Sequence, residues 1–329
     1  MLARTVSADQ GGQRLDKYLR RLLPNVPTSH IYKMIRTRKV RLNGKRAYGE
    51  TLLTAGDEVT VRADEERLLA APSETALRPG RPLNVLYEDD HLMAVDKPSG
   101  LAVHPGSGIV GATLVELSRA HTGLRPQGEF QTSPAHRLDR DTSGVVLVAK
   151  SRRAMVRLTE MFTAGEVKKE YLALVKGRFS GDRGTVDLPL AEHEQTAKSR
   201  DERGVKLQLA VTHYRVIGAG RQVSLLSCSI ETGRTHQIRR HLAAIGHPVV
   251  GDRRHGDFAL NRKLKAEAGL TRLFLHACRL AFSHPVSGKA LKLESRLPLD
   301  LQEVLRRLEV SGADKLTFEA AKLSDPRGG

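Results

Sequence analysis

Residues 136–150, HRLDRDTSGVVLVAK, join a densely charged turn to an apolar run. The run Val145–Ala149 has the length and β-branched composition of a buried strand. The turn before it holds Asp139 and Asp141 among arginines and a histidine. This pattern is typical either of an Asx-type turn with local ion pairs, or of a carboxylate that arginine keeps ionised at the mouth of a sheet. An ion pair at about 4 Å and an effective dielectric of 20 contributes about 4 kcal/mol before desolvation, which favours the ionised form.

The chain around this turn alternates short apolar runs with glycine and proline over residues 83–310. Segments with helical spacing are fewer. The mixture predicts the α+β class, with a domain built around a mixed, mostly antiparallel sheet. The apolar runs are Leu92–Val95, Val145–Ala149, Tyr171–Val175, Val223–Leu226 and Leu273–Leu275, and the helical segments are about 112–120, 151–164, 235–246 and 299–308.

The N-terminal residues 1–62 predict a separate small α/β domain of two helices and a hairpin. Leucines at 15, 19 and 22 share one helix face, and Pro24 and Pro27 end that helix. A second helix, capped by Thr28 or Ser29, directs Lys33 and Arg36 outward, and Asn43-Gly44 marks a tight turn. Residues 13–46 hold 11 Lys or Arg and one acid. This basic surface is either a solvated face or a surface that binds phosphates.

Two further segments complete the predicted organisation. Residues 63–82, rich in Ala, Pro and Glu, predict a linker, and residues 311–329 predict a polar tail. The predicted domains are therefore 1–62 and 83–310.

Composition narrows the class of partner. The 329 residues carry 54 Lys or Arg and 37 Asp or Glu, a net charge of +17. Such a surplus favours a polyanion, most commonly nucleic acid, over membrane binding or mere solubility. The longest apolar run has five residues, far short of the roughly 20 of a transmembrane helix. We see no secretory signal, and the two cysteines, Cys228 and Cys278, form no CxxC pair. A cytoplasmic protein is expected.

A second charged cluster, Glu231–His241, contains GRTHQIRRH. It indicates either a helix start that binds a phosphate or an exposed basic helix face. The GxGxxG sequence at Gly106–Gly111 lacks the preceding buried strand that a dinucleotide site requires. We find no HExxH, no GKS or GKT loop and no GxSxG, so neither a metal nor a cofactor is predicted.

Taken together and in order, HRLDRDTSG, GRTHQIRRHL, VDKPSGLAVHPGSG, KKEYLALVKG and LFLHACRLAFSHP resemble the RluA-type pseudouridine synthases. RLDKYLRRLLPNVPTSHIYKMIRTRKVRLNGK is similar to the small RNA-binding domain first known from ribosomal protein S four. HPGSG and GDRRHGDFALNRKLKAEAGLTRLFLHA are most similar to the branch that acts on large-subunit (23S) ribosomal RNA, although His255 stands where many relatives carry Tyr. The resemblance covers about nine-tenths of the chain.

This resemblance implies a cofactor-free isomerisation of uridine to pseudouridine. Asp139 is implied as the nucleophile, or as the base at the 2′ position, with Arg234 as its ion-pair partner. Tyr171 stacks on the uracil in this scheme, Arg137 fills the space left by the flipped base, and Leu275 lines the base pocket. Tyr171 and Leu275 are equally consistent with ordinary core positions.

Three alternatives stay open at this point. A non-catalytic RNA-binding ribosome-assembly factor would use the same fold and basic domain. A related synthase would act on transfer RNA. A glycoside or nucleoside hydrolase would also need carboxylates near an anomeric carbon, but Asp139 and Asp141 are only two residues apart. The expected partner is large-subunit ribosomal RNA, and nothing in the sequence demands more than a monomer.

Overall fold

The computed structural model describes residues 2–23, 26, 28–62, 82–106, 111–123, 130–191 and 207–312. The chain divides into two compact units, and each is described by itself. The first holds the N-terminal 81 residues with 104–112, and the second holds 82–103 and everything after 112. Within the described residues, no helix is both long and apolar enough to span a bilayer.

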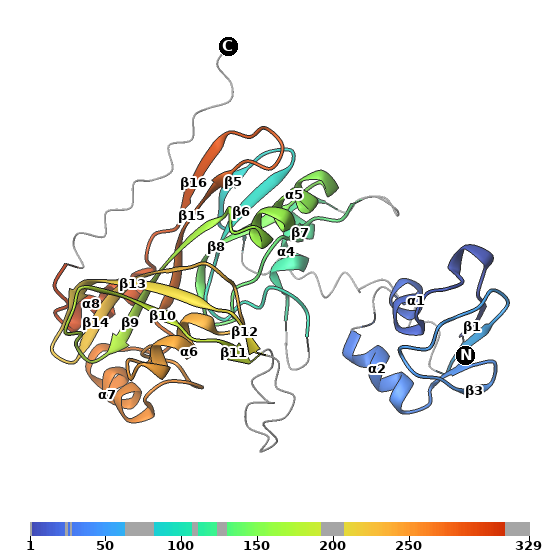
Figure 1. Cartoon of the computed structure of the whole chain (residues 1–329), viewed down its shortest axis with the longest axis horizontal. Helices are drawn as coiled ribbons and strands as arrows, with labels where there is room; N and C mark the ends of the chain where they lie inside the picture. The colour runs from blue at the N-terminus through green and yellow to red at the C-terminus, as the bar shows by residue number, and fades with distance from the viewer. Residues whose placement is uncertain are drawn as a thin grey trace, which may run out of the picture. The chain divides into compact units, whose positions relative to one another are not determined.

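The N-terminal unit is a four-stranded sheet packed against two helices (Figure 1). The expected hairpin forms at Asn43 and Gly44, whose positive φ angles of 50° and 72° fit a tight two-residue turn. The sequence missed the first strand, which pairs with the last one to complete the sheet. Pro24, Pro27 and the side chains of Thr28 and Ser29 lie outside the described residues. The elements are β1 (Leu2–Thr5), η1 (Ala8–Gln10), α1 (Leu15–Leu22), α2 (Thr28–Arg36), β2 (Val40–Leu42), β3 (Lys45–Arg46) and β4 (Glu58–Val61), in sheet order β1-β4-β2-β3.

The second unit is built around a ten-stranded sheet, which confirms the α+β prediction. The order along its main path is β10-β13-β14-β9-β15-β8-β6-β5, with β16 on β15 and β7 on β8. Every pair is antiparallel except β15 with β8. The strands are β5 (Val85–Glu88), β6 (Leu92–Lys97), β7 (Ser133–Pro134), β8 (Ser143–Ala149), β9 (Lys168–Lys176), β10 (Arg183–Asp187), β13 (Val211–Ala219), β14 (Val223–Ile230), β15 (Leu275–Ser283) and β16 (Ala290–Glu294). A separate pair joins β11 (Leu190–Ala191) and β12 (Leu207–Gln208).

Helices cover parts of both faces of this sheet. The predicted ones are α4 (Leu114–Thr122), α5 (Arg152–Thr163), α6 (Gln237–Ala244) and α8 (Leu299–Arg307). The sequence missed α7 (Phe258–Ala268), in which only Leu264 and Ala268 of the six apolar residues are buried. The predicted linker is undescribed over 63–81 and the predicted tail over 313–329. The domain boundaries at 62 and 310 therefore stay predictions.

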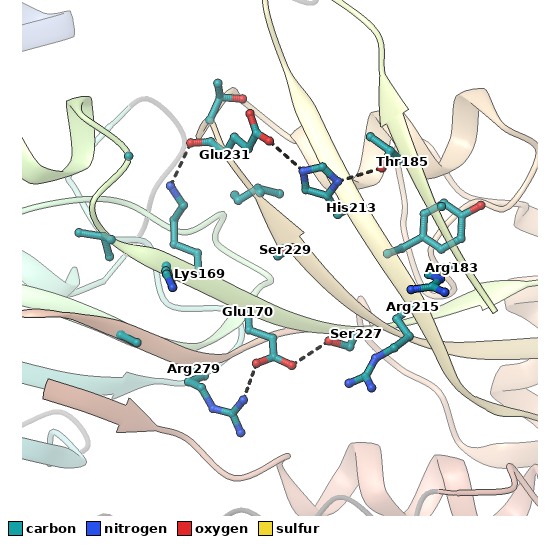
Figure 2. A pocket seen from close by; sticks show the side chains of 18 of the residues that line it. Lys169, Glu170, Arg183, Thr185, His213, Arg215, Ser227, Ser229, Glu231 and Arg279 are labelled. Carbon is teal, nitrogen blue, oxygen red and sulfur yellow. Dashed lines mark hydrogen bonds and ion pairs between the residues drawn. The ribbon is translucent and has the colours of Figure 1, made fainter. Parts of the chain in front are cut away.

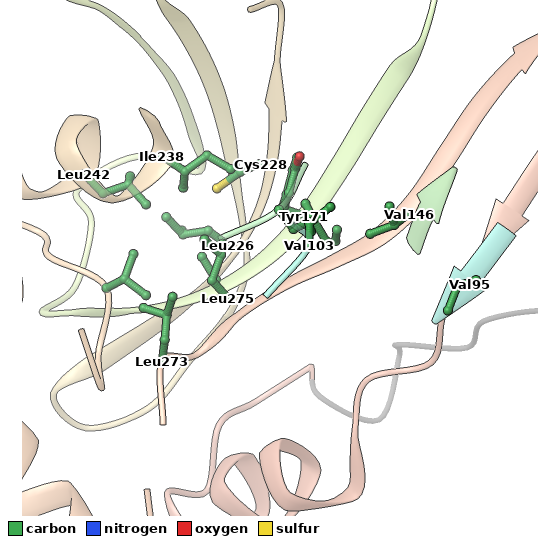
Figure 3. Packing of buried hydrophobic residues seen from close by; sticks show 14 of the residues in the cluster. Val95, Val103, Val146, Tyr171, Leu226, Cys228, Ile238, Leu242, Leu273 and Leu275 are labelled. Atoms are coloured by element: carbon green, nitrogen blue, oxygen red, sulfur yellow. The ribbon is translucent and has the colours of Figure 1, made fainter. Parts of the chain in front are cut away.

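Alternation along the central strands separates two apolar faces. One face carries Tyr171 and Ala173 of β9 with Leu226 and Cys228 of β14, and α6 packs against it through Ile238 and Leu242 (Figure 3). We call this the catalytic face. The opposite face packs against α7 and α8 around β9 and β14, and against α5 around β6 and β8.

Candidate active site

The loop that carries Asp139 enters the sheet directly, because β8 begins four residues later at Ser143. Leu138, beside it, is buried in the apolar cluster of the catalytic face. The N–H of Thr142 donates to the carbonyl oxygen of Asp139 at 3.2 Å, which closes a turn. The charged stretch is thus a tight turn tied to the core on one side, and Asp139 lies at its exposed edge.

A second loop fixes this turn from behind. Lys97, fully buried, donates from Nζ to the carbonyl oxygens of Pro98, Leu101 and Arg140 at 2.8–3.0 Å. Ser99 Oγ donates to the carbonyl of Asp141, and the N–H of Gly100 donates to that of Arg140. Burial lowers the pKa of Lys97 to about 7, and the charges of Asp139 and Asp141 oppose that shift. The turn that carries Asp139 is therefore held through its backbone carbonyls, and these contacts do not involve its carboxylates.

Arg239 joins Asp139 to a second, fully buried carboxylate. Its Nη1 lies 3.0 Å from Asp139 Oδ2, while Nε and Nη2 donate to Asp252 at 2.6 and 2.9 Å. Burial opposes the charge of Arg239, but the hydrogen bonds and attraction of Asp252, then Asp139, raise its pKa above the ordinary value. Burial likewise opposes the charge of Asp252, yet Arg239 and the N–H groups of His255 and Arg254 lower its pKa. The guanidinium is held in one orientation by its back side and presents the other side to Asp139.

The structure places Arg239, and not the predicted partner Arg234, against Asp139. The side chain of Arg234 points elsewhere. It is exposed, and Nε donates to the carbonyl of Leu209 at 3.2 Å. The reason is local geometry. Gln237 accepts from the N–H of Arg234 and from Thr232 and donates to Val211, so the helix α6 begins only at Gln237. Arg239 is on the inward side of that helix and Arg234 precedes it.

His236 adds a strained residue beside the carboxylate. It has a φ of 53°, in the left-handed region that non-glycine residues rarely adopt. Its Nε2 lies 3.7 Å from Asp139 Oδ1, and its Nδ1 lies 3.3 Å from His255 Nε2. Strained backbone of this kind clusters at functional sites, where surrounding contacts hold it. The sequence analysis did not select this histidine for the site.

Tyr171 and Leu275 belong to the apolar wall of the catalytic face. Both are buried, at 8% and 4% exposure, in one cluster with Leu273 and Cys228 (Figure 3). Burial and then the charge of Asp139 raise the pKa of Tyr171 above its ordinary value, so its phenol is neutral near pH 7. Their placement agrees with both earlier interpretations, an ordinary core position and a wall for a base.

The other predicted site residues lie on surfaces. Arg137, two residues before Asp139, is exposed, and so are Lys33 and Arg36 on α2 of the N-terminal unit. In the structure, the charge of Asp139 acts on the buried phenol of Tyr171. Arg239 and His236 lie beside Asp139, and Asp252 holds Arg239. These roles stay predictions.

A cavity of about 280 Å³ gathers the polar groups. Among the residues that the structure describes, no cluster of His, Cys, Asp and Glu has the geometry of a metal site. A larger groove, of about 1130 Å³, contains none of these site residues. The smaller cavity is lined by Asp139, Arg140, Asp141, His236, Arg239, Gly251, Asp252, Arg253, Arg254 and Leu273.

The chain belongs to the RNA pseudouridylate synthase family, as the comparisons with known proteins show. The model of that family matches residues 91–244, and the S4 domain model matches residues 13–59. Ribosomal large subunit pseudouridine synthase C of Escherichia coli is 40% identical over 309 residues, which cover 92% of this chain and 95% of that protein. The protein of the same name in Vibrio cholerae is 40% identical over 311 residues, with the same coverage. The sequence resemblance is confirmed.

Solved structures give the same result for the fold. Human RNA Pseudouridylate Synthase Domain Containing 4 is 26% identical with a TM-score of 0.56, covering 69% of this chain and 93% of that one. Human RNA Pseudouridylate Synthase Domain Containing 1 is 25% identical with a TM-score of 0.53, covering 66% and 84%.

Proposed function

We propose that this protein isomerises selected uridines of large-subunit (23S) ribosomal RNA to pseudouridine. The observation that carries the proposal is Asp139 held by Arg239 at one rim of a polar cavity whose wall continues into the apolar cluster around Tyr171. The curated relatives that bear the name ribosomal large subunit pseudouridine synthase C support the choice of RNA.

The proposed reaction uses one carboxylate, and the nucleotide neither gains nor loses atoms overall. In one route, Asp139 attacks the anomeric carbon C1′, and the electron pair of the C1′–N1 bond leaves with the uracil. The uracil rotates, its C5 bonds to C1′ as Asp139 departs, and the proton on C5 is lost while N1 gains one. In the other route, Asp139 removes the proton from C2′, a C1′=C2′ double bond forms, and the electron pair of the C1′–N1 bond leaves with the uracil. C5 then bonds to C1′ while C2′ regains the proton, and C5 loses its proton while N1 gains one. Both routes need an oriented carboxylate, and the fixed guanidinium of Arg239 orients Asp139.

The apolar wall has a separate task in this proposal. A uridine reaches the carboxylate only after it leaves its stack, at a cost of a few kcal/mol. Tyr171 and Leu275 offer a surface on which the flipped base stacks, and the neutral phenol adds no charge there. Arg137, exposed on the same turn, occupies the space that the base vacates.

The N-terminal domain, residues 1–62, is proposed to bind the RNA backbone through Lys33 and Arg36. Each phosphate contact contributes roughly 0.7 to 0.9 to the slope of log affinity against log salt. Replacing both with Ala should therefore lower the slope by about 1.4 to 1.8. Arg4→Ala, in strand β1 of the same unit, is the control and should leave the slope unchanged. An unchanged slope in the double variant would mean that this basic face is only solvated. We further propose that the protein acts in the cytoplasm as a monomer and without a cofactor.

The decisive experiment maps pseudouridines, base by base, in unmodified large-subunit ribosomal RNA incubated with the purified protein alone. The Asp139→Ala variant is assayed in parallel. New pseudouridines with the wild type only are expected, and they would also identify the target sites. Tight binding with no new signal would contradict the proposal, and transfer RNA would then separate a different substrate from a non-catalytic binding factor.

A further inference from the structure

The larger groove lies on the face of the sheet opposite Tyr171. Cross-strand register shows this, since directly paired residues share a face. Tyr171 pairs with Cys228 and Cys228 with Tyr214, which also borders the groove, whereas the polar groove residues of the two rows named next occupy the alternate positions. One row across the sheet is Glu170, Ser229, His213 and Thr185, and the next row is Ser227, Arg215 and Arg183. We call these two rows the rear groove.

The rear groove contains a like-charge pair that no residue in the described part of the chain neutralises. Arg183 of β10 and Arg215 of β13 are directly paired across antiparallel strands, and both are exposed. Among the described residues, the side chain of Arg215 has no hydrogen-bond or ion-pair partner, and that of Arg183 has only the exposed Asp182 at 3.9 Å. Like charges directly opposite each other destabilise a sheet. No described contact offsets the repulsion between these two arginines, and a bound anion would remove that repulsion.

Two carboxylates, Glu170 and Glu231, line the groove, and both have partners within it. Glu170 accepts from Arg279 at 2.6 Å and from Ser227 at 2.8 Å. Glu231 lies 2.9 Å from His213 Nε2, and the other ring nitrogen of His213 lies 2.9 Å from Thr185 Oγ1 (Figure 2). The two carboxylates are thus engaged, and the uncompensated charge of the rear groove is positive.

We propose that the rear groove binds the phosphodiester backbone of the substrate RNA, with a phosphate between Arg183 and Arg215. Arginines and the hydroxyls of Ser, Thr and Tyr are the side chains that contact phosphate and sugar oxygens in nucleic-acid complexes. Ser227, Ser229 and Thr185 supply hydroxyls along the same rows. The volume of the groove is about 1130 Å³. The identity of the polyanion as RNA rests on the proposed function.

The position of the groove determines how long an RNA must be to reach it. The target uridine enters on the face of Tyr171, so a short hairpin bound there does not reach the opposite face. Only a longer RNA that passes around the edge of the sheet does. The rear groove therefore contributes to affinity for large ribosomal RNA fragments and leaves the chemical step untouched.

The test compares two full-length double variants that remove the same charge. Arg183→Ala/Arg215→Ala removes the two paired arginines of the rear groove. Arg153→Ala/Arg262→Ala removes two exposed helical arginines that do not line the groove. Equilibrium binding is measured against KCl concentration with a long fragment of large-subunit RNA and with a short hairpin containing a target uridine. Single-turnover rates are measured on the hairpin.

For the rear-groove variant we expect about threefold to tenfold weaker binding of the long fragment and a salt slope lower by about 1.4 to 1.8. Hairpin binding and turnover should match the wild type. Arg183→Lys/Arg215→Lys, which keeps the charge, should restore most of the affinity. A long-fragment slope equal to that of the Arg153/Arg262 control would overturn the proposal. If the wild-type protein itself forms no pseudouridine in the hairpin, the proposed function is overturned instead.

Discussion

The two faces of the central sheet use the same strands for opposite purposes. On β9, Tyr171 faces the apolar cluster beside Asp139, whereas Glu170, its neighbour in sequence, faces the rear groove. On the catalytic face, the charges of Asp139, Arg239 and Asp252 form one connected network. On the rear face, the carboxylates are paired locally and two arginines are left without a strong partner.

Successive side chains of a β-strand point to opposite faces of the sheet, so one strand can serve a different purpose on each face. A face that needs defined chemistry orients every charge through a partner that is itself held. A face that binds a flexible polyanion gains more from exposed cations that need no fixed geometry. Changes on the catalytic face should therefore reduce turnover, and changes on the rear face should reduce only affinity.

The largest expected effect follows from Asp139→Asn. The amide keeps the shape of the side chain but provides neither a nucleophile nor a base, so turnover should fall by roughly 10⁴-fold or more. Hairpin binding should stay within about threefold of the wild type, since the variant removes a negative charge next to a polyanion. Single-turnover pseudouridine formation measures the first quantity and filter binding the second. Activity within tenfold of the wild type would refute the assignment of Asp139.

The next effect separates Arg239 from Arg234. Arg239→Ala leaves Asp252, with no exposed side-chain surface, as an uncompensated buried charge. Breaking a buried pair in this way costs about 3–5 kcal/mol of unfolding free energy, and turnover should fall by about 10²-fold or more because Asp139 loses its oriented partner. Arg234→Ala should cost less than about 1 kcal/mol and change turnover several-fold at most, because its side chain is exposed.

Because Arg239→Ala affects both stability and turnover, a second variant separates them. Arg239→Ala/Asp252→Ala removes the buried charge and should recover part of the unfolding free energy, while turnover stays low. Urea unfolding and single-turnover kinetics measure the two quantities. Equal loss of turnover in the Arg234 and Arg239 variants would contradict the assignment of Arg239 alone as the residue that orients Asp139.

The sequence predicted the fold better than it predicted the ion pair. Apolar runs revealed the buried strands, and charged turns revealed Asp139, because both signals are local. Arg239 and Arg234 lie in the same short cluster, five residues apart, and composition gives them equal weight. The choice between them depends on where α6 begins, which Gln237 determines through contacts with β13.

Other features were beyond any local pattern. Asp252 joins the site from a segment 113 residues after Asp139 and is recognisable only once Arg239 lies between them. Lys97 is one of 54 cations in the sequence, and nothing beside it predicts a fully buried ammonium held by three carbonyls. The rear groove was missed because Arg183 and Arg215 acquire meaning only through cross-strand register.

A third prediction disturbs both faces at once. Gly144 has a φ of 118° where β8 meets β15, and a Cβ there would lie 2.1 Å from the carbonyl oxygen of Ala277. Gly144→Ala should therefore cost about 3 kcal/mol or more of unfolding free energy, because backbone must move at the only parallel pair of the described sheet. Gly288→Ala, at φ 74° with open space, is the control and should cost about 1 kcal/mol. Similar costs in urea unfolding would show that β8 and β15 separate easily.

The smallest effect concerns pH and the residue that begins the catalytic stretch. His136 Nε2 accepts a hydrogen bond from the N–H of Leu147 at 2.9 Å, and its ring packs against Phe162 with centroids 4.6 Å apart. An amide N–H only donates, so Nε2 is unprotonated in the folded state. Burial, with the nearby charge of Lys169, lowers the pKa of His136 to about 3. The unfolded chain, with a histidine pKa near 6.5, binds the extra proton between these values.

Stability should therefore be lost as the pH falls from about 6.5 toward 3, at up to about 1.4 kcal/mol per pH unit from this one group. His136→Gln offers an oxygen acceptor to Leu147 and does not titrate, so the stability of the wild type relative to this variant should fall by about 1.6 kcal/mol between pH 6.5 and pH 5. His136→Phe also lacks the titration but leaves the Leu147 N–H unpaired, which costs about 1–3 kcal/mol at every pH. Urea unfolding of the three proteins across this range measures all three terms. A wild-type slope in His136→Gln would mean that His136 is protonated in the folded state and that the contact to Leu147 does not hold the catalytic turn to β8.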